Sequence, residues 1–406
     1  MDIPRFAVVG LGGFAKMHLR YVQDAVEAGL GRHVAQVAIP ADRELFAEEV
    51  AALRAQGVEI FLSLREMLAE ARERIDVTCI PTGTPLHRPM AVAALEAGTN
   101  VLVEKPAAGS IQDVGAMIRA RDAAGKLCAV GYQHIYRPDT QQLKQWVCEG
   151  RFGAIKRVKS FGCWPRNADY YQRNGWAARL ALQDTWVLDS PHNNALAHAV
   201  NAMCYVACSR PGESLVPTAV LAELYRANPI ESADTTVFRA DTREGVEVFF
   251  AVSHCTDRLL NPTTVFETDQ ARIEWTYAGD TTICWHDGAT EHSEGPGNVR
   301  RVAEDVAQVL LGRKKSLYCP LEVARAQTLC ICGTFESSAI HELPEGLRTV
   351  DAKGFTAVRG MTEAVVEAFE EAALFSELGV EWAQSGESVS LEGYDYFPTF
   401  RRQVGG

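Results

Sequence analysis

Apolar runs and helix-like spacing alternate along the first third of the chain. Runs rich in Val and Ile have the length of strands, and they lie at 6–9, 34–39, 58–62, 75–80, 99–103 and 127–131. Helical patterns fill the gaps, and glycines such as Gly98 and Gly125 close two of them. Six strands joined by crossover helices predict an α/β fold with a doubly wound parallel sheet.

The rest of the chain has another pattern. Strand-like segments dominate 216–285, the stretch 299–311 has helical spacing, and a further helix is expected from Thr362. The end of the chain is too aromatic for a disordered tail and is expected to pack on the body or on a second subunit, through Tyr394, Tyr396, Phe397 and Phe400. We therefore expect one domain at 1–132 and a second at 133–406.

A glycine-rich loop lies between the first strand and the first helix. It reads Gly10-Leu11-Gly12-Gly13-Phe14-Ala15 and fits the pattern G-x-G-x-x-A. Gly10 permits a tight turn, Gly12 lets a pyrophosphate approach the backbone, and Ala15 lets the helix pack closely on the sheet. In this strand and helix context the loop favours a Rossmann-type dinucleotide site over a purely structural turn.

The second strand lacks the acid that would bind the adenosine ribose of NAD. Ile39 stands where that acid is expected, and Asp42 and Arg43 follow. Arg43 is a candidate for a 2'-phosphate, which would favour NADP, whereas Asp42 is a candidate for the ribose. Both residues are equally compatible with the start of a solvent-facing helix. The cofactor prediction is therefore NAD or NADP.

The strand at 99–103 ends on Glu104-Lys105-Pro106. Ligands of open α/β sheets bind beyond the carboxyl ends of the strands, so this acid and lysine are candidates for chemistry. A lysine there can exchange a proton with a substrate hydroxyl.

Several motifs together resemble one enzyme family. They are the glycine loop, Ile80-Pro81-Thr82-Gly83-Thr84-Pro85-Leu86-His87, Ala97 to Pro106, and Val130-Gly131-Tyr132-Gln133. In order and spacing they resemble the glucose-fructose oxidoreductase/inositol dehydrogenase (Gfo/Idh/MocA) family of NAD(P)-dependent oxidoreductases.

The resemblance implies more than the spacing does. It implies a C-terminal α+β domain with an open, mostly antiparallel sheet, a carbohydrate-like substrate, and a homo-oligomer such as a dimer or tetramer. Lys105 would lie near the nicotinamide and the substrate. The implied cofactor-binding residues outside the glycine loop are Thr82, Pro85, His87, Glu104, Lys105 and Gln133.

The family also has a catalytic His-x-x-Asp pair in its second domain. His198-x-x-Asn201 fits best here, with asparagine in place of aspartate. Because His198 then lacks a carboxylate partner that could raise its basicity, Lys105 becomes the main candidate for proton transfer. His192 is a competing candidate that Asp189 can orient, or else a satisfied buried histidine. The catalytic candidates are therefore Lys105, His198 and His192.

The segment 164–179 is dense in aromatic, amide and arginine side chains, which suit sugars. A long connection held by its aromatic residues is the alternative. The predicted substrate-binding residues are Tyr171, Arg173, Asn174, Trp176, Arg179, Asn194 and His198.

We predict hydride transfer between NAD(P) and a secondary hydroxyl of a sugar, polyol or cyclitol. One alternative is a glycosidase or lyase that reduces its NAD only transiently. A non-catalytic NAD(P)-binding sensor is another.

Composition and charge limit the kinds of partner and metal site that we expect. The formal charge of -12, with 52 acidic and 40 basic residues, argues against nucleic acid as a partner. Eleven cysteines form no C-x-x-C pair and no zinc-like spacing, so no metal is predicted. The sequence has no signal peptide or membrane-length apolar run, which predicts a cytoplasmic protein without a membrane partner.

Overall fold

The computed structural model describes residues 2–297 and 301–398. Contacts divide the chain into two compact units. The first unit holds the chain up to Ala108, Asp113–Arg137, and a later segment that ends at Ala324. The second holds Gly109–Gln112, the chain from Pro138, and the chain from Arg325. The division at residue 132 stays a prediction, and nothing in the sequence pattern indicated the later segment of the first unit.

The first unit is built on a six-stranded sheet in which every strand pair is parallel. Its strands follow the order β3 (Glu59–Phe61), β2 (Arg32–Val37), β1 (Arg5–Val9), β4 (Val77–Ile80), β5 (Asn100–Val103) and β6 (Cys128–Val130). This is the strand order of a dinucleotide-binding Rossmann sheet. The predicted doubly wound fold is confirmed, and β4, β5 and β6 are buried along their length, as parallel strands require.

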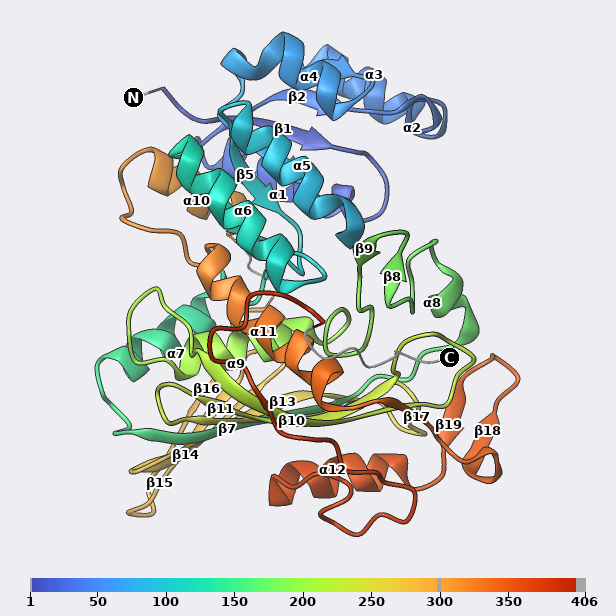
Figure 1. The fold of residues 1–406 in the computed structure, drawn as a ribbon. Helices are drawn as coiled ribbons and strands as arrows, with labels where there is room; N and C mark the ends of the chain where they lie inside the picture. Colours follow the sequence, from blue (N-terminus) through green and yellow to red (C-terminus); the bar gives the residue numbers. More distant parts are fainter. Residues whose placement is uncertain (1, 298–300, 399–406) are drawn as a thin grey trace. The chain divides into compact units, whose positions relative to one another are not determined.

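The crossover segments of the first unit are helical (Figure 1). They are α1 (Ala15–Glu27), α2 (Pro40–Leu45), α3 (Ala47–Ala55), α4 (Leu64–Ala71) with η1 (Arg72–Arg74), α5 (Thr84–Glu96) and α6 (Ile111–Ala124). Gly98 and Gly125 have positive φ after α5 and α6, as predicted. Helix α10 (Val302–Leu310) packs against α1, and residues 299 and 300 of the predicted 299–311 helix lie outside the described residues.

The second unit contains a ten-stranded mixed sheet, mostly antiparallel. Its path is β16 (Thr290–Ser293), β15 (Thr281–Trp285), β14 (Ala271–Thr276), β13 (Leu260–Thr268), β7 (Ile155–Cys163), β12 (Glu247–Ser253), β11 (Thr235–Thr242), β10 (Pro217–Arg226) and β17 (Ile340–Glu342), while β20 (Val389–Ser390) pairs with β10. Only β7 with β12 and β10 with β17 are parallel pairs in the part of this sheet that the structure describes. The predicted open α+β sheet is confirmed.

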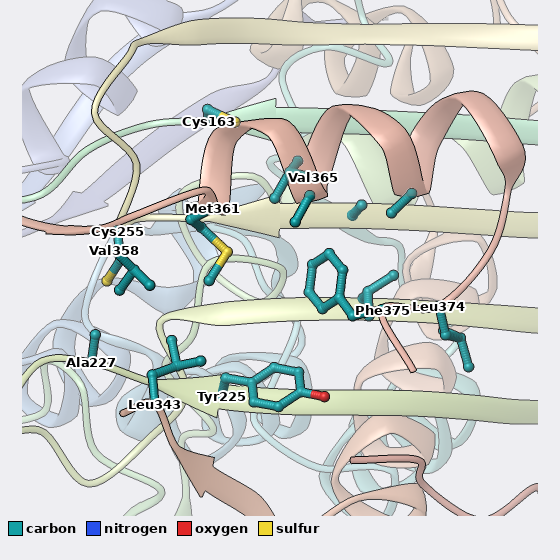
Figure 2. Close-up of a cluster of buried hydrophobic side chains, with 14 of the residues drawn as sticks. Cys163, Tyr225, Ala227, Cys255, Leu343, Val358, Met361, Val365, Leu374 and Phe375 are labelled. Atoms are coloured by element: carbon teal, nitrogen blue, oxygen red, sulfur yellow. The ribbon is translucent and has the colours of Figure 1, made fainter. Parts of the chain in front are cut away.

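Helices pack on the sheet of the second unit. Helix α9 (Ala197–Ala207) contacts β7, β12 and β13, and α12 (Met361–Glu371) contacts β7 and β12 from the opposite face (Figure 1). Figure 2 shows Met361 and Val365 of α12 facing strand residues such as Tyr225, and all three are completely buried. This apolar layer explains the helical stripe predicted from Thr362.

The remaining elements of the chain complete the description. They are α7 (Pro138–Cys148), α8 (Ala168–Gln172), α11 (Leu321–Ser337), η2 (Glu345–Leu347), and the short pairs β8 (Ala181–Leu182) with β9 (Thr185–Trp186) and β18 (Arg348–Val350) with β19 (Thr356–Val358). In the aromatic tail Tyr394 and Phe397 are buried and Tyr396 is exposed, whereas Phe400 lies outside the described residues. Phe397 contacts the ring of Trp186, so the tail packs on the second unit.

Candidate functional site

The glycine loop joins β1 to α1 at the carboxyl end of the sheet. Gly10 has a φ of 90°, and its amide donates to the carbonyl of Val37 on β2 over 2.9 Å. A Cβ added to Gly12 would lie 3.2 Å from the Phe46 ring, so a side chain would fill the space in front of the loop. The loop therefore offers the exposed backbone and close approach that a pyrophosphate needs, and a dinucleotide fits it.

The rest of the predicted loop agrees with this arrangement. Gly13 has positive φ and nothing within 4 Å of an added Cβ, Phe14 is 44% exposed, and α1 begins at Ala15. Gln36 on β2 is a residue that the sequence interpretation missed. Its side-chain amide donates to the carbonyl of Gly10 over 2.6 Å and fixes the turn. A buried glutamine inside an apolar strand was the available signal.

The segment after β2, where an acid would bind the adenosine ribose, has Ile39 in place of that acid. Ile39 is 49% exposed directly before α2. Arg43 donates from Nε to the carbonyl of Ala38 over 3.0 Å and from Nη2 to that of Ile60 over 3.3 Å. Arg43 thus holds the ends of β2 and β3 together and keeps a positive charge there, and the choice between NAD and NADP stays a prediction.

Glu104 enters a buried polar cluster at the end of β5. Its Oε2 lies 3.1 Å from Nε2 of His18 on α1, and both side chains are buried. Gly131 makes room for this carboxylate, since a Cβ there would lie 2.7 Å from Oε2. Tyr21, one turn along α1, donates to Oε1 of Gln133 over 2.9 Å. The predicted Glu104 and Gln133 therefore both contact side chains of α1.

His18 was missed, although the sequence carries a signal for it. It lies with Tyr21, Val22 and Ala25 on the buried stripe of α1. A histidine at helical spacing among apolar residues needs a polar partner in the core.

His87 holds the Glu-Lys-Pro segment from the other side. Its Nδ1 lies 2.7 Å from the carbonyl of Pro106, and its Nε2 lies 2.9 Å from that of Thr82. Burial lowers the pKa of His87, although the two carbonyls favour the charged ring. His87 therefore ties the loop after β4 to the segment after β5, which leaves Lys105 half-buried between two fixed neighbours.

Two further cofactor candidates lie at the same end of the sheet. Pro85 is buried in the first turn of α5, where proline is tolerated. The hydroxyl of Thr82 is buried and has no hydrogen-bond partner among the described residues. Glu104 Oε1 and His18 Nδ1 are also buried without a hydrogen-bond partner among the described residues. These polar atoms of the first unit can therefore bind a ligand or ordered water.

The two candidate histidines of the second unit differ in their surroundings. His198 lies half-buried in the first turn of α9, one turn before the buried Asn201, as predicted. His192 is completely buried, and its ring nitrogens lie 3.0 Å from the Thr236 hydroxyl and 2.9 Å from the Thr334 hydroxyl. Burial lowers the pKa of His192 to about 3. Its geometry is that of a satisfied core histidine.

Of the two alternatives left open for His192, orientation by Asp189 is not found, and a satisfied buried histidine is found. Asp189 accepts from the amide of Ala178 over 2.5 Å, from Arg173 over 3.3 Å, and from Asn194 over 2.6 Å. These three donors satisfy both carboxylate oxygens, and threonines satisfy His192 instead. Arg173 and Asn194, predicted to bind substrate, therefore stabilise the loop around Asp189 in this structure.

Two of the predicted substrate residues, Tyr171 and Arg179, line a pocket of the second unit, whereas Asn174, Trp176 and His198 are not among its lining residues. This pocket has a volume of about 300 Å³, and Tyr171, Arg179 and Glu231 are among its lining residues. Asn174 accepts from the amide of Trp176, and Arg173 stacks near the Trp176 ring. The aromatic and arginine segment thus forms a concave surface large enough for one sugar ring.

The described residues contain neither a metal-ligand cluster nor a membrane-spanning helix. Within 2–297 and 301–398, no three His, Cys, Asp or Glu side chains gather as a metal ion would require. No helix in the described part of the chain is both long and apolar enough to cross a membrane.

A family model matches the first unit. Residues 4–132 match the model described as "Oxidoreductase family, NAD-binding Rossmann fold" of the Gfo/Idh/MocA group. The match covers about a third of the chain and shows that the first unit is similar to the Gfo/Idh/MocA family. The predicted resemblance is confirmed, and so is the prediction of a nicotinamide dinucleotide as the type of cofactor.

Curated relatives match the chain over part of its length. Inositol 2-dehydrogenase/D-chiro-inositol 3-dehydrogenase of Halalkalibacterium halodurans is 24% identical over 200 residues, which is 47% of this chain and 54% of the relative. A 4-carboxy-2-hydroxymuconate-6-semialdehyde dehydrogenase of Sphingobium is 29% identical over 38% of this chain and 46% of the relative. The chain spans about half the length of the curated relatives it matches.

A solved structure extends the likeness beyond the first unit. The WlbA dehydrogenase from Bordetella pertussis, in complex with NADH and UDP-GlcNAcA, has a TM-score of 0.66. Its sequence is 22% identical, and the alignment covers 82% of this chain and 96% of that one. At this identity the likeness establishes the fold alone.

Proposed function

We propose that this protein is an NAD(P)-dependent oxidoreductase that transfers a hydride to or from a secondary hydroxyl of a sugar, polyol or cyclitol. One observation carries the proposal. Lys105 follows β5 at the carboxyl end of the Rossmann sheet, and its neighbours Glu104 and Pro106 are fixed by His18 and His87. Relatives named as inositol dehydrogenases support this class of substrate.

The role of each residue follows from its place. The glycine loop binds the pyrophosphate through backbone amides, and Thr82, Pro85 and His87 are proposed as cofactor-site residues beside Lys105. When bound, NAD or NADP supplies the hydride acceptor or donor. Lys105 exchanges a proton with the substrate hydroxyl, and a fixed position is what makes such a group efficient. His198 is proposed as a second proton-transfer or substrate-orienting residue.

A substrate panel tests this function. The purified protein is incubated with NAD⁺ or NADP⁺ and a range of sugars, polyols and cyclitols, and reduced cofactor is measured by absorbance at the nicotinamide band. We expect reduced cofactor with some members of the panel, and Lys105→Ala should lower kcat by about 10²–10⁴-fold. A homo-oligomer is proposed as well, to be measured by light scattering.

Lys126 provides a matched control. It is a half-buried lysine of the same unit, but it precedes β6 and so lies at the amino end of the sheet. Lys126→Ala should leave turnover unchanged. Full turnover by Lys105→Ala would refute the role of this lysine. Product without net reduced cofactor would support the transient-redox alternative, and cofactor binding without any hydride transfer would support a sensor.

A further inference from the structure

The second unit contains a polar cluster at the carboxyl ends of its adjacent parallel strands β7 and β12. After β7 ends, the amide of Trp164 donates to the carbonyl of Ser253, and the amide of Arg166 donates to that of His254, each over 3.1 Å. These bonds continue the pairing of the two strands. They bring Arg166 and His254 together although 87 residues separate them in the sequence.

Arg166 carries a positive charge that no acid among the described residues neutralises. Its guanidinium lies 4.8 Å from the ring centroid of Tyr170 and 5.3 Å from that of Trp164. Within the same described residues it forms no ion pair, and its Nε is buried without a hydrogen-bond partner. An arginine stacked on aromatic rings with an unused N–H is preorganised for an anionic ligand.

Two acids whose charges act on Tyr170 and Tyr171 are already bound elsewhere. Asp189 is paired with Arg173 and two further donors. Asp234 is buried and accepts from the amides of Ala227 and Asn228 over 2.9 Å each. Neither carboxylate reaches Arg166, so the cluster retains one uncompensated positive charge.

His254 and Tyr171 add unused polar atoms. His254 is 2% exposed, and neither of its ring nitrogens has a partner among the described residues. The hydroxyl of Tyr171 is also buried without a partner there, and the two rings are 6.4 Å apart. Burial, followed by the charges of Arg166 and Arg173, holds the pKa of His254 well below its usual range, so the ring is neutral. Each unpaired buried group costs about 1–3 kcal/mol, which a ligand can offset.

One member of the cluster, Tyr171, lines a pocket, whereas Arg166 and His254 are not among the residues that line it. This is the pocket of about 300 Å³ described above, where Arg179 and Glu231 add polar groups of opposite charge. This volume is at the lower end of the range for small-molecule sites, which suits one six-membered ring.

We propose that Arg166, Tyr171 and His254 form a carboxylate-binding subsite, so that the substrate is an acidic, ring-sized polyol such as a sugar acid. The inference rests on the proposed function and specifies its substrate class. One uncompensated guanidinium matches one negative charge, whereas a doubly charged phosphate would need further cations. Arg166 Nε, the Tyr171 hydroxyl and the His254 N–H supply three donors for the two carboxylate oxygens.

Binding measured by calorimetry tests the subsite independently of turnover. The full-length protein is titrated with D-glucuronate and D-galacturonate, and with D-glucose and D-galactose as neutral partners of the same shape. We expect at least one acid to bind about tenfold more tightly than its neutral partner. Arg166→Gln should abolish this preference, and Tyr171→Phe, which removes only a hydroxyl, should reduce it about threefold.

Arg151 offers a matched control in the same unit. Its guanidinium stacks 4.4 Å from the Trp146 ring but is paired with Glu291 over 2.6 Å. Arg151→Gln should keep the full preference, and thermal melting shows whether each variant is folded. Equal affinity for acids and neutral sugars, or a preference that survives in folded Arg166→Gln, would overturn the subsite. Hydride transfer to neutral sugars alone would overturn it too while leaving the proposed function intact.

Discussion

The two units differ in how their candidate ligand-binding sites are built. In the first unit, consecutive residues of the glycine loop and of Glu104-Lys105-Pro106 form the site, and backbone groups supply most of it. In the second unit, Arg166 and Tyr171 lie in one segment, His254 comes from a distant one, and all three act through side chains. A backbone-built site can therefore be recognised as a sequence motif, whereas a side-chain cluster exists only after the strands pair.

The largest expected effect tests the backbone-built site. In Gly12→Val the new side chain would collide with Phe46, since even a Cβ lies 3.2 Å from that ring. We expect the affinity for NADH to fall about 100-fold, which corresponds to about 2.7 kcal/mol. Nicotinamide fluorescence during titration measures this affinity.

Gly175 supplies the control for that substitution. An added Cβ at Gly175 meets nothing within 4 Å, and the residue lies in the second unit. Gly175→Val should bind NADH as the wild type does. Unchanged NADH affinity in Gly12→Val would mean that the loop is a structural turn.

A second experiment compares two buried histidines of the second unit. His192→Leu removes two hydrogen bonds to threonine hydroxyls and should lower the free energy of unfolding by about 2 kcal/mol. His254→Leu removes two ring nitrogens that have no partner among the described residues, so its free energy of unfolding should change by less than about 0.5 kcal/mol or rise. Urea unfolding measures both. An equal loss in the two variants would contradict a ligand-binding role for the unpaired ring.

The same two histidines should also contribute to the pH dependence of stability, with a smaller effect. Burial lowers the pKa of His192 to about 3, whereas the unfolded chain titrates near its usual value of 6.5. Between these values the unfolded state binds the extra proton, so stability is full above about 6.5 and falls as the pH falls toward 3. One such proton contributes at most about 1.4 kcal/mol per pH unit.

Urea unfolding at pH 7 and pH 5 measures this slope. His192→Leu should lose less stability over the interval than the wild type does. His254→Leu should behave similarly, because burial also holds the pKa of His254 low. A wild-type slope that survives unchanged in both variants would assign the acid sensitivity to other groups.

Local sequence patterns accounted for much of the first unit. The alternation of six apolar runs with helical patterns predicted the parallel sheet, because buried parallel strands must be apolar on both faces. The glycine loop predicted the turn at Gly10, because only glycine readily adopts its positive φ. His18 was not predicted because its partner Glu104 is 86 residues away.

The second unit was less predictable. Its strands and α12 followed from local patterns, but α7 and α11 were not predicted. Asp189 and His192 are three residues apart, and their pairing was one of two alternatives left open, but tertiary contacts gave each of them other partners. Spacing along the chain decides a contact only within one helix or turn.

Local backbone preference and apolar periodicity are properties of the sequence alone, and they were enough to specify the class of fold, the dinucleotide loop and the position of Lys105. Which polar side chains are satisfied depended instead on tertiary contacts. The fold paired His192 with two threonines and left His254 and Tyr171 with polar atoms that no other described residue uses, beside Arg166. The physical reason is that hydrogen bonding in a core depends on neighbours brought together by strand pairing, which no local pattern records.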